Sequence, residues 1–125
     1  AKRPLSSMTP TIVFDEGEPF LAIGSPGGSR IITAVLQIIL NVVDFEQSLE
    51  EATGSKRIHH QWYPDDIDIE ENYDQLNQLI DLGYEVDIID TATCTQSIMI
   101  GNGEFIGVSD LRRPDSLALG VKNDR

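Results

Sequence analysis

The clearest hydrophobic pattern in the chain lies between Ser29 and Asp44, where polar residues recur at spacings of three and four. The polar positions are Arg30, Thr33, Gln37, Asn41 and Asp44. Such spacing predicts an α-helix, because residues three and four apart share one helix face. All other faces carry Ile, Leu, Val or Ala, so the helix must be covered on most sides. We therefore expect part of this helix to face a partner layer that the chain does not fully provide.

The rest of the pattern predicts short strands and two shorter helices. Strands are expected at 11–14, 19–23, 67–70, 84–89 and 117–121, with a turn at 15–18, an extended segment at 56–62, and a hairpin formed by 96–100 and 105–108. Helices are expected at 45–52 and at 74–82, the second ending at Gly83. This order predicts one α/β (α+β) unit spanning residues 1–125, with mostly antiparallel pairing.

The composition fits a globular domain or a piece of one. The chain has 125 residues, of which 40% are hydrophobic, so a packed core is feasible. No stretch reaches the roughly 20 apolar residues that a membrane span needs. Cys94 is the only cysteine, which excludes an internal disulfide, and we interpret it as a small half-buried hydrophobic side chain.

The net charge of −12 is unevenly distributed. Residues 58–111 contain twelve Asp and Glu and no Lys or Arg. Because such a surface repels phosphate backbones, we do not expect nucleic-acid binding. We interpret this stretch as a solvated acidic face. A cation site at Asp65, Asp66 and Asp68 is an alternative, although the segment lacks the glycine and the spacing of a calcium loop.

The segment from Gly24 to Ser29 is the first candidate for chemistry, because a strand ends, two glycines follow and a helix begins. The first amides of a helix have no acceptor within the helix, and glycines let a ligand approach the backbone closely. The amides of Gly27 and Gly28 can therefore form an anion site, such as one for the oxyanion of an acyl-transfer intermediate. A tight turn without a ligand and a phosphate site are alternatives, although neither common phosphate-binding glycine pattern is present.

Ser6 and Ser7 are the second candidate, because paired hydroxyls in a loop can donate hydrogen bonds to a carboxylate. They can equally cap a turn or hold the loop. Neither lies in a Gly-x-Ser-x-Gly elbow, so the sequence does not support a serine hydrolase.

Two histidines and three arginines complete the candidates. His59 and His60 are adjacent on an extended segment and must point to opposite faces, so we expect packing or hydrogen bonding near Trp62 and no zinc site. Arg57, Arg112 and Arg113 are expected to form structural ion pairs with the acidic middle of the chain.

Several motifs resemble segments of the γ-glutamyltranspeptidases. Pro4-Leu5-Ser6-Ser7-Met8 is similar to one family segment, and Gly24-Ser25-Pro26-Gly27-Gly28-Ser29-Arg30-Ile31 is similar to a second at the right distance. The segments Arg57–Trp62 and Arg112–Asp115 are similar to regions near the family's C-terminus, although Leu111 and Ser116 replace a proline and a glycine often found there. The resemblance covers nearly all of the chain.

The resemblance implies part of an N-terminal-nucleophile hydrolase with four αββα layers, of which this chain is a partial domain. Such enzymes transfer or hydrolyse the γ-glutamyl group of glutathione or a related amide, and an amino acid or water accepts it. Ser6 and Ser7 would then bind the α-carboxylate of the donor, and Gly27 and Gly28 would supply the oxyanion hole. The resemblance implies neither a metal nor a cofactor.

The resemblance also implies that the catalytic threonine lies upstream of Pro4, since residue 1 is Ala. No internal threonine replaces a nucleophile that needs a free N-terminal amine, so we expect the isolated chain to be inactive. Its partners would be the rest of the small subunit and the large subunit, with self-association as a further expectation, and its location periplasmic or extracellular. The alternative is a non-catalytic module that kept the fold and binds amino acids or another protein.

Overall fold

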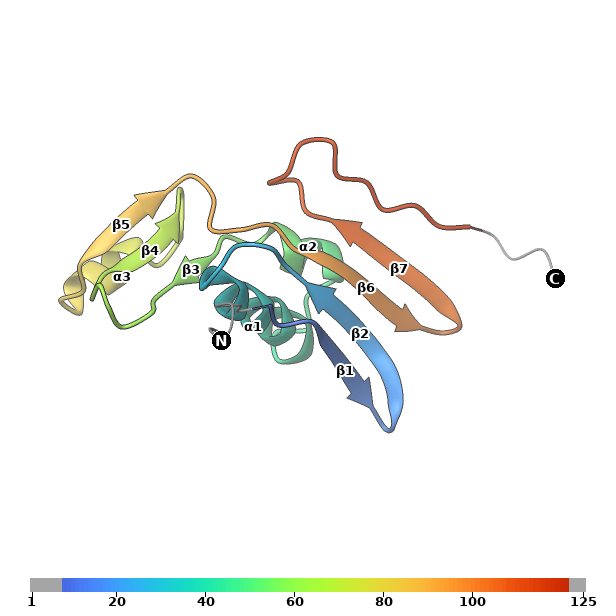
Figure 1. Cartoon of the computed structure of the whole chain (residues 1–125). Coiled ribbons are helices and arrows are strands. Elements are labelled where there is room, and N and C mark those ends of the chain that lie inside the picture. Colours follow the sequence, from blue (N-terminus) through green and yellow to red (C-terminus); the bar gives the residue numbers. More distant parts are fainter. Residues whose placement is uncertain (1–7, 122–125) are drawn as a thin grey trace, which may run out of the picture.

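The computed structural model describes residues 8–121, which form two sheets with helices packed beside them (Figure 1). The strands are β1 (Thr11–Asp15), β2 (Glu18–Gly24), β3 (Ile58–His59), β4 (Ile67–Glu70), β5 (Val86–Ile89), β6 (Gln96–Gly101) and β7 (Glu104–Ser109). The helices are α1 (Arg30–Val43), α2 (Leu49–Gly54) and α3 (Leu76–Asp81). The predicted mixed α/β class is confirmed.

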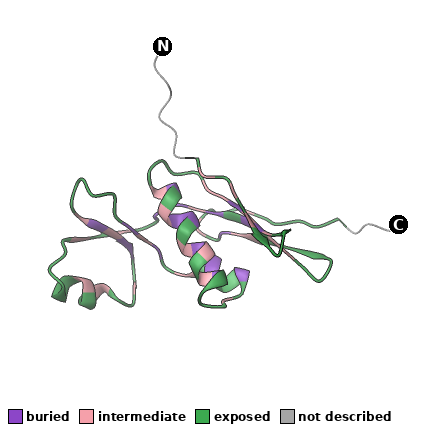
Figure 2. Cartoon of the chain, turned by 90° about the horizontal axis from the view of Figure 1, so that it is seen from below, coloured by how far each residue is buried: buried purple, intermediate pink, exposed green. Residues whose placement is uncertain are grey.

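The larger sheet has four antiparallel strands in the order β1-β2-β6-β7. Its centre joins two hairpins from distant parts of the chain, because β2 pairs with β6 and Leu21 lies opposite Met99. One face of the sheet packs against α1 (Figure 2). The buried apolar side chains of this core are Leu21, Ile23, Ile31, Val35, Ile38, Val42, Leu49 and Ala52.

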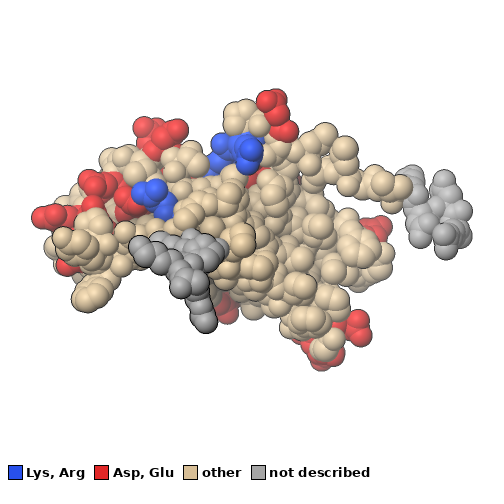
Figure 3. Space-filling view, viewed as in Figure 1, with Lys and Arg blue, Asp and Glu red and all other residues tan. Residues whose placement is uncertain are grey.

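The smaller sheet has the order β3-β4-β5 and lies at the other end of the molecule (Figure 1). β3 and β4 are antiparallel, whereas β4 and β5 are parallel. A parallel pair needs a crossover connection, and α3 lies within it. Acidic side chains gather at this end (Figure 3), consistent with the acidic run in the sequence.

The outer face of α1 confirms the expectation of incomplete cover. Ile32, Leu36, Leu40 and Val43 recur along one side of the helix and are exposed. A second apolar surface lies on the face of the larger sheet that points away from α1, where Ile12, Ile98 and Phe105 are exposed. The larger sheet and α1 therefore form two packed layers, each with an apolar surface open to solvent.

Two predicted elements were wrong in extent or in kind. The helix expected at 45–52 begins only at Leu49, because Ser48 and Glu51 form a capping box that fixes its start. Residues 117–121 form no strand; they pass close to β7, since a Cβ on Gly107 would lie 3.3 Å from the Cβ of Ala118. Alternating apolar residues predict a strand, but a strand also requires a hydrogen-bonding neighbour.

The remaining helices and strands match their predicted positions with shifts at the ends. The segment 56–62 is a strand only at β3, and α3 is shorter than the expected helix at 74–82. Among residues 8–121, no helix is long and apolar enough to cross a membrane.

Candidate functional site

The glycine turn, residues 24–29, connects β2 to α1. Gly27 has a φ of +129° and Gly28 a φ of +62°, conformations that favour glycine. The amide of Arg30 donates to the carbonyl oxygen of Gly27 at 3.3 Å, and that of Ile31 donates to Gly28 at 3.4 Å. The first two helical amides therefore donate back to the carbonyl oxygens of the glycine turn.

The amides of Gly27 and Gly28 donate to no acceptor within residues 8–121, and both glycines are exposed. Ser29, the N-cap, makes no side-chain cap hydrogen bond. These groups stand at the positive end of a 14-residue helix, where the aligned peptide dipoles favour negative charge. The turn can therefore accept an anion or an oxygen that develops negative charge.

The hydroxyl groups of Ser25 and Thr93 form hydrogen bonds that connect the glycine turn to the segment before β6. The Oγ of Ser25 lies 2.7 Å from the carbonyl oxygen of Cys94 and 3.0 Å from the Oγ1 of Thr93. The Thr93 hydroxyl also donates to the carbonyl oxygen of Pro26. Cys94 itself is half-buried, as the sequence indicated.

A small polar hollow lies beside the start of α1. It has a volume of about 370 Å³ and is lined by Ser29, Arg30, His59, Gln61, Pro64, Asp66 and Asp68. Arg30 forms an ion pair with Asp68 at 2.5 Å, which ties the helix to the smaller sheet. One wall of the turn is therefore polar and charged.

The two histidines lie in different environments, as expected for adjacent residues on an extended segment. His59 is buried and its Nδ1 lies 2.8 Å from the hydroxyl of Thr33. His60 is exposed and its Nε2 lies 3.1 Å from Asp65. Among residues 8–121, no group of three or more potential metal ligands is close enough to hold an ion. Asp65 and Asp68, two residues of the alternative cation site considered from the sequence, instead pair with His60 and Arg30.

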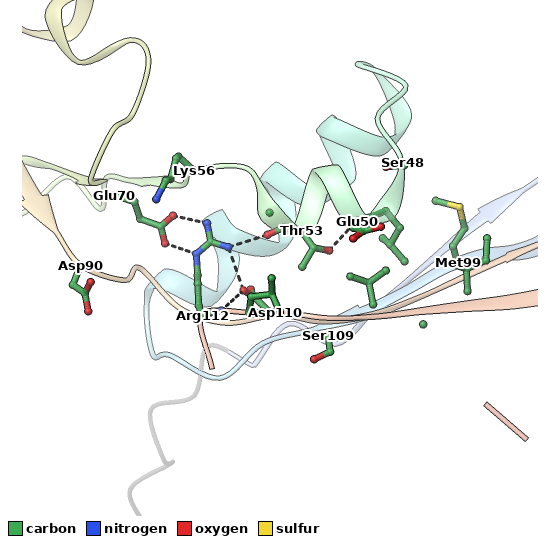
Figure 4. Close-up of a pocket in the computed structure, with 16 residues that line it drawn as sticks. Ser48, Glu50, Thr53, Lys56, Glu70, Asp90, Met99, Ser109, Asp110 and Arg112 are labelled. Carbon is green, nitrogen blue, oxygen red and sulfur yellow. Dashed lines mark hydrogen bonds and ion pairs between the residues drawn. The ribbon is translucent and has the colours of Figure 1, made fainter. Parts of the chain in front are cut away.

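A cluster of four charged side chains joins the two sheets, and we call it the charge cluster: Arg57, Glu70, Asp110 and Arg112. Figure 4 shows three of them, Glu70, Asp110 and Arg112. Arg57 pairs with Asp110 at 2.8 Å, and Arg112 pairs with Glu70 at 2.5 Å and with Asp110 at 3.2 Å. The structure therefore confirms the expected ion pairs of Arg57 and Arg112. Arg113 contributes a backbone hydrogen bond to Asp110 and takes part in none of the ion pairs among residues 8–121.

Both carboxylates of the charge cluster stay ionised despite their burial. Burial alone would raise the pKa of Glu70, but hydrogen bonds from Arg112 and the amide of Ala92 lower it overall. Burial also opposes ionisation of Asp110, whose pKa is lowered by the charge of Arg57 and by the amide of Thr95. The charge cluster is thus compensated, which is what a structural role requires.

A larger cleft of about 780 Å³ opens beside the charge cluster, between α2 and β7 (Figure 4). Its lining combines apolar side chains, such as Met99 and Val108, with Arg112 and Asp110. The Oγ of Ser109 on its wall has no hydrogen-bond partner among residues 8–121. The charged groups of the cluster are satisfied by one another and by backbone groups, and the other charged residues that line the cleft are Glu50, Lys56 and Asp90.

The sequence located Gly27 and Gly28 at an exposed turn, whereas Ser6 and Ser7 lie outside the described residues. Sequence reasoning missed Thr93 and Ser25 as supports of the turn, and it missed Glu70 and Asp110 as partners of the arginines. The signal for the acids was present only as the acidic run. The signal for Thr93 was absent, because its contact with the turn depends on strand pairing.

The sequence model of the family described as Gamma-glutamyltranspeptidase matches residues 1–120 of this chain. The glutathione hydrolase proenzyme of Escherichia coli strain K12 is 48% identical over 122 residues, which cover 95% of this chain and 21% of that protein. The chain therefore spans about a fifth of the length of this curated relative.

Solved structures of γ-glutamyltranspeptidases are also similar to this chain. A γ-glutamyltranspeptidase from Pseudomonas nitroreducens, complexed with L-DON, superposes with a TM-score of 0.88 at 35% identity, over 97% of this chain and 65% of that one. A cephalosporin acylase from Bacillus halodurans superposes with a TM-score of 0.81 over 90% of this chain and 22% of that one. At 16% identity, the acylase shows a shared fold alone.

Proposed function

The chain belongs to the γ-glutamyltranspeptidase family, and from this premise we propose that it is the C-terminal part of an enzyme that transfers or hydrolyses the γ-glutamyl group of glutathione or a related amide. Its role is to bind the substrate and to stabilise the transition state. The nucleophile, a threonine in this family, would come from outside residues 1–125.

The exposed glycine turn is the observation that carries this proposal. Attack on a γ-glutamyl amide places negative charge on the carbonyl oxygen, and the amides of Gly27 and Gly28 are free to donate to it. Because the donors are fixed before the reaction, their stabilisation costs no reorganisation. Removal of one such donor costs roughly 10²–10³ in rate.

The substrate carboxylate site remains a prediction. Ser6 and Ser7 would donate hydrogen bonds to the α-carboxylate of the glutamyl group, while the glycine turn binds the reacting end. Two contacts at opposite ends of a short substrate would fix its orientation, which is a large part of the catalytic advantage.

The two open apolar surfaces support an αββα arrangement in the complete protein. A second sheet would cover the outer face of the larger sheet, and another helix would cover the exposed side of α1. The remainder of the small subunit and the large subunit would supply these layers. In keeping with the family, we place the complete enzyme in the periplasm or outside the cell.

The test is a chimaera, hereafter the chimaeric enzyme, in which residues 1–125 replace the matching C-terminal segment of the E. coli relative. We expect it to release the chromophore from a γ-glutamyl anilide, whereas the isolated chain shows no activity above background. A folded but inactive chimaeric enzyme would favour a non-catalytic module and contradict the proposal.

Two variants of the chimaeric enzyme test the site assignments. Replacement of both Ser6 and Ser7 by Ala should raise KM, because the substrate carboxylate loses its donors. Gly28→Pro removes one amide donor and also forces the turn out of the φ of +62° that Gly28 adopts, so kcat should fall by at least the roughly 10²–10³ expected for one lost donor. Thr91→Val, a change at an exposed position in the connection between β5 and β6, serves as the matched control.

A further inference from the structure

Thr93 contacts the glycine turn although it lies far away in the sequence. It belongs to the connection between β5 and β6, and it is buried. The pairing of β2 with β6 places Gly24 opposite Gln96, so the residues just before β6 lie beside the residues just after β2. Thr93 therefore reaches the turn from a different part of the chain, at the side opposite to solvent.

The Thr93 hydroxyl controls the orientation of one particular peptide unit. It donates to the carbonyl oxygen of Pro26. That carbonyl shares a planar peptide with the amide of Gly27, and in a trans peptide the C=O and N–H bonds point in opposite directions. When the carbonyl is held toward Thr93, the N–H of Gly27 must point away from Thr93, toward the exposed side of the turn.

Steric contact reinforces the hydrogen bond. A Cβ on Gly27 would lie 2.5 Å from the Oγ1 of Thr93 and 2.9 Å from its Cβ, distances that no side chain tolerates. Thr93 thus packs directly on the backbone of Gly27. At Gly28 a Cβ would meet nothing within 4 Å, so the close packing is confined to the first glycine.

Thr93 is itself fixed by the charge cluster. The Nη1 of Arg57 donates to the carbonyl oxygen of Thr93 at 2.5 Å, and Arg57 is buried. On the other side of Thr93, its hydroxyl lies 3.0 Å from that of Ser25, which also contacts the carbonyl of Cys94. Thr93 is therefore held in place by contacts on both of its sides.

From these contacts we propose that Thr93 is a positioning residue, whose hydroxyl keeps the amide of Gly27 directed at the oxyanion. This inference rests on the proposed function of the glycine turn. The Oγ of Ser25 also donates to the carbonyl oxygen of Pro26, at 2.7 Å and in an exposed position. Without the Thr93 hydroxyl, this contact alone holds the peptide between Pro26 and Gly27, so the peptide rotates more easily and the turn loses one of its two aligned donors for part of the time. Thr93 touches neither substrate nor nucleophile in this account.

The experiment compares three substitutions in the chimaeric enzyme with a γ-glutamyl anilide as substrate. Enzymes of this family cut their own precursor into two subunits, and kcat is counted per molecule processed in this way. Thr93→Val keeps the shape and removes the hydroxyl, and it should lower this kcat by about 10- to 100-fold. Thr93→Ser keeps the hydroxyl and should stay within about threefold of the parent. Thr91→Val, nearby and exposed, should match the parent.

KM and the thermal midpoint separate positioning from general damage. A loss confined to kcat, with KM and the midpoint near those of the parent, supports the proposal, because a transition-state contact is lost without ground-state binding. If Thr93→Val does not fold, Thr93→Ala, which adds no bulk, takes its place in the comparison.

Two results would overturn the proposal while leaving the proposed function intact: full activity of Thr93→Val or Thr93→Ala, or an equal loss in Thr93→Ser, which would assign the effect to the methyl group. An inactive parent chimaera that is folded and processed would instead contradict the proposed function, and the role of Thr93 would fall with it.

Discussion

The two sheets of this chain are stabilised in different ways. The larger sheet buries apolar side chains against α1, and its central residue Leu21 is fully buried. The smaller sheet carries α3, none of whose side chains is buried, and Ile88 on β5 is 58% exposed. One end of the molecule therefore has a hydrophobic core of its own, while the other is thin, acidic and dependent on its neighbours.

The charge cluster lies at the junction between the two sheets and attaches the smaller sheet to the larger one. Glu70 closes β4 of the smaller sheet, Asp110 follows β7 of the larger one, and Arg57 and Arg112 bind them together. Ion pairs thus stabilise the junction between the sheets, whereas apolar burial stabilises the core of the larger sheet. Because the two regions are stabilised differently, we expect acid to weaken the junction and side-chain truncation to weaken the hydrophobic core.

The largest effect is expected from a break at the junction. Arg57→Met leaves Asp110 buried without its closest partner, which should cost about 3–5 kcal/mol. We expect the chimaeric enzyme with this change to accumulate as poorly folded or unprocessed protein, as measured by gel analysis and thermal unfolding. Arg113→Met, at an exposed position outside the charge cluster, is the control. Equal behaviour of the two variants would show that the junction is not held by charge.

A matched pair of truncations compares the two ends directly. Ile38→Ala removes a side chain that is 1% exposed and should destabilise α1 by about 2–5 kcal/mol, because it leaves a cavity. Ile88→Ala removes an exposed side chain, and its cost should stay below about 1 kcal/mol. Hydrogen exchange of α1 and β5 in the chimaeric enzyme measures both, and similar changes would contradict the contrast between the sheets.

Acid should weaken the junction first. The pKa values of Glu70 and Asp110 are lowered in the folded state, so their contribution is complete above the unfolded pKa of about 4 and is lost as the pH falls through the folded values. Thermal midpoints of the chimaeric enzyme between pH 3 and pH 7 should therefore drop below about pH 4. Glu70→Gln should flatten this drop, and an unchanged slope would exclude Glu70 as its source.

The smallest effect, with the opposite sign, is expected at the acidic end. A shared hydrogen bond with Asp66, together with repulsion from it, raises the pKa of Asp87. A raised pKa means that the ionised pair disfavours the folded state at neutral pH and that protonation relieves this as the pH falls. Asp87→Asn should raise the thermal midpoint slightly at pH 7 and leave it unchanged near pH 4. A lower midpoint at pH 7 would reverse the assignment.

The sequence predicts the parts of this fold that depend on local signals. The helix over 29–44 follows from periodicity, and the turn at Gly27 and Gly28 follows from a strand, two glycines and a helix in succession. The open side of α1 was also foreseeable, because the helix is apolar around most of its circumference. Each of these conclusions needs only neighbours in the chain.

The contacts that the sequence did not predict all depend on strand pairing. The partners of the arginines, Glu70 and Asp110, could not be selected from twelve acidic residues before the order of the two sheets was known. Thr93 gave no sign of its role for the same reason. The strand expected at 117–121 was wrong because an alternating pattern does not reveal whether a neighbouring strand is available.

The pairing of β2 with β6 at the centre of the larger sheet also has a consequence for folding during synthesis. The ribosome releases β2 and α1 before β6 and before Thr93, which precedes β6. Contacts between such distant segments close a long loop and form slowly. The glycine turn therefore lacks the support of Thr93 until that residue and β6 have been made, and a truncation upstream of Thr93 releases a chain in which this support is missing.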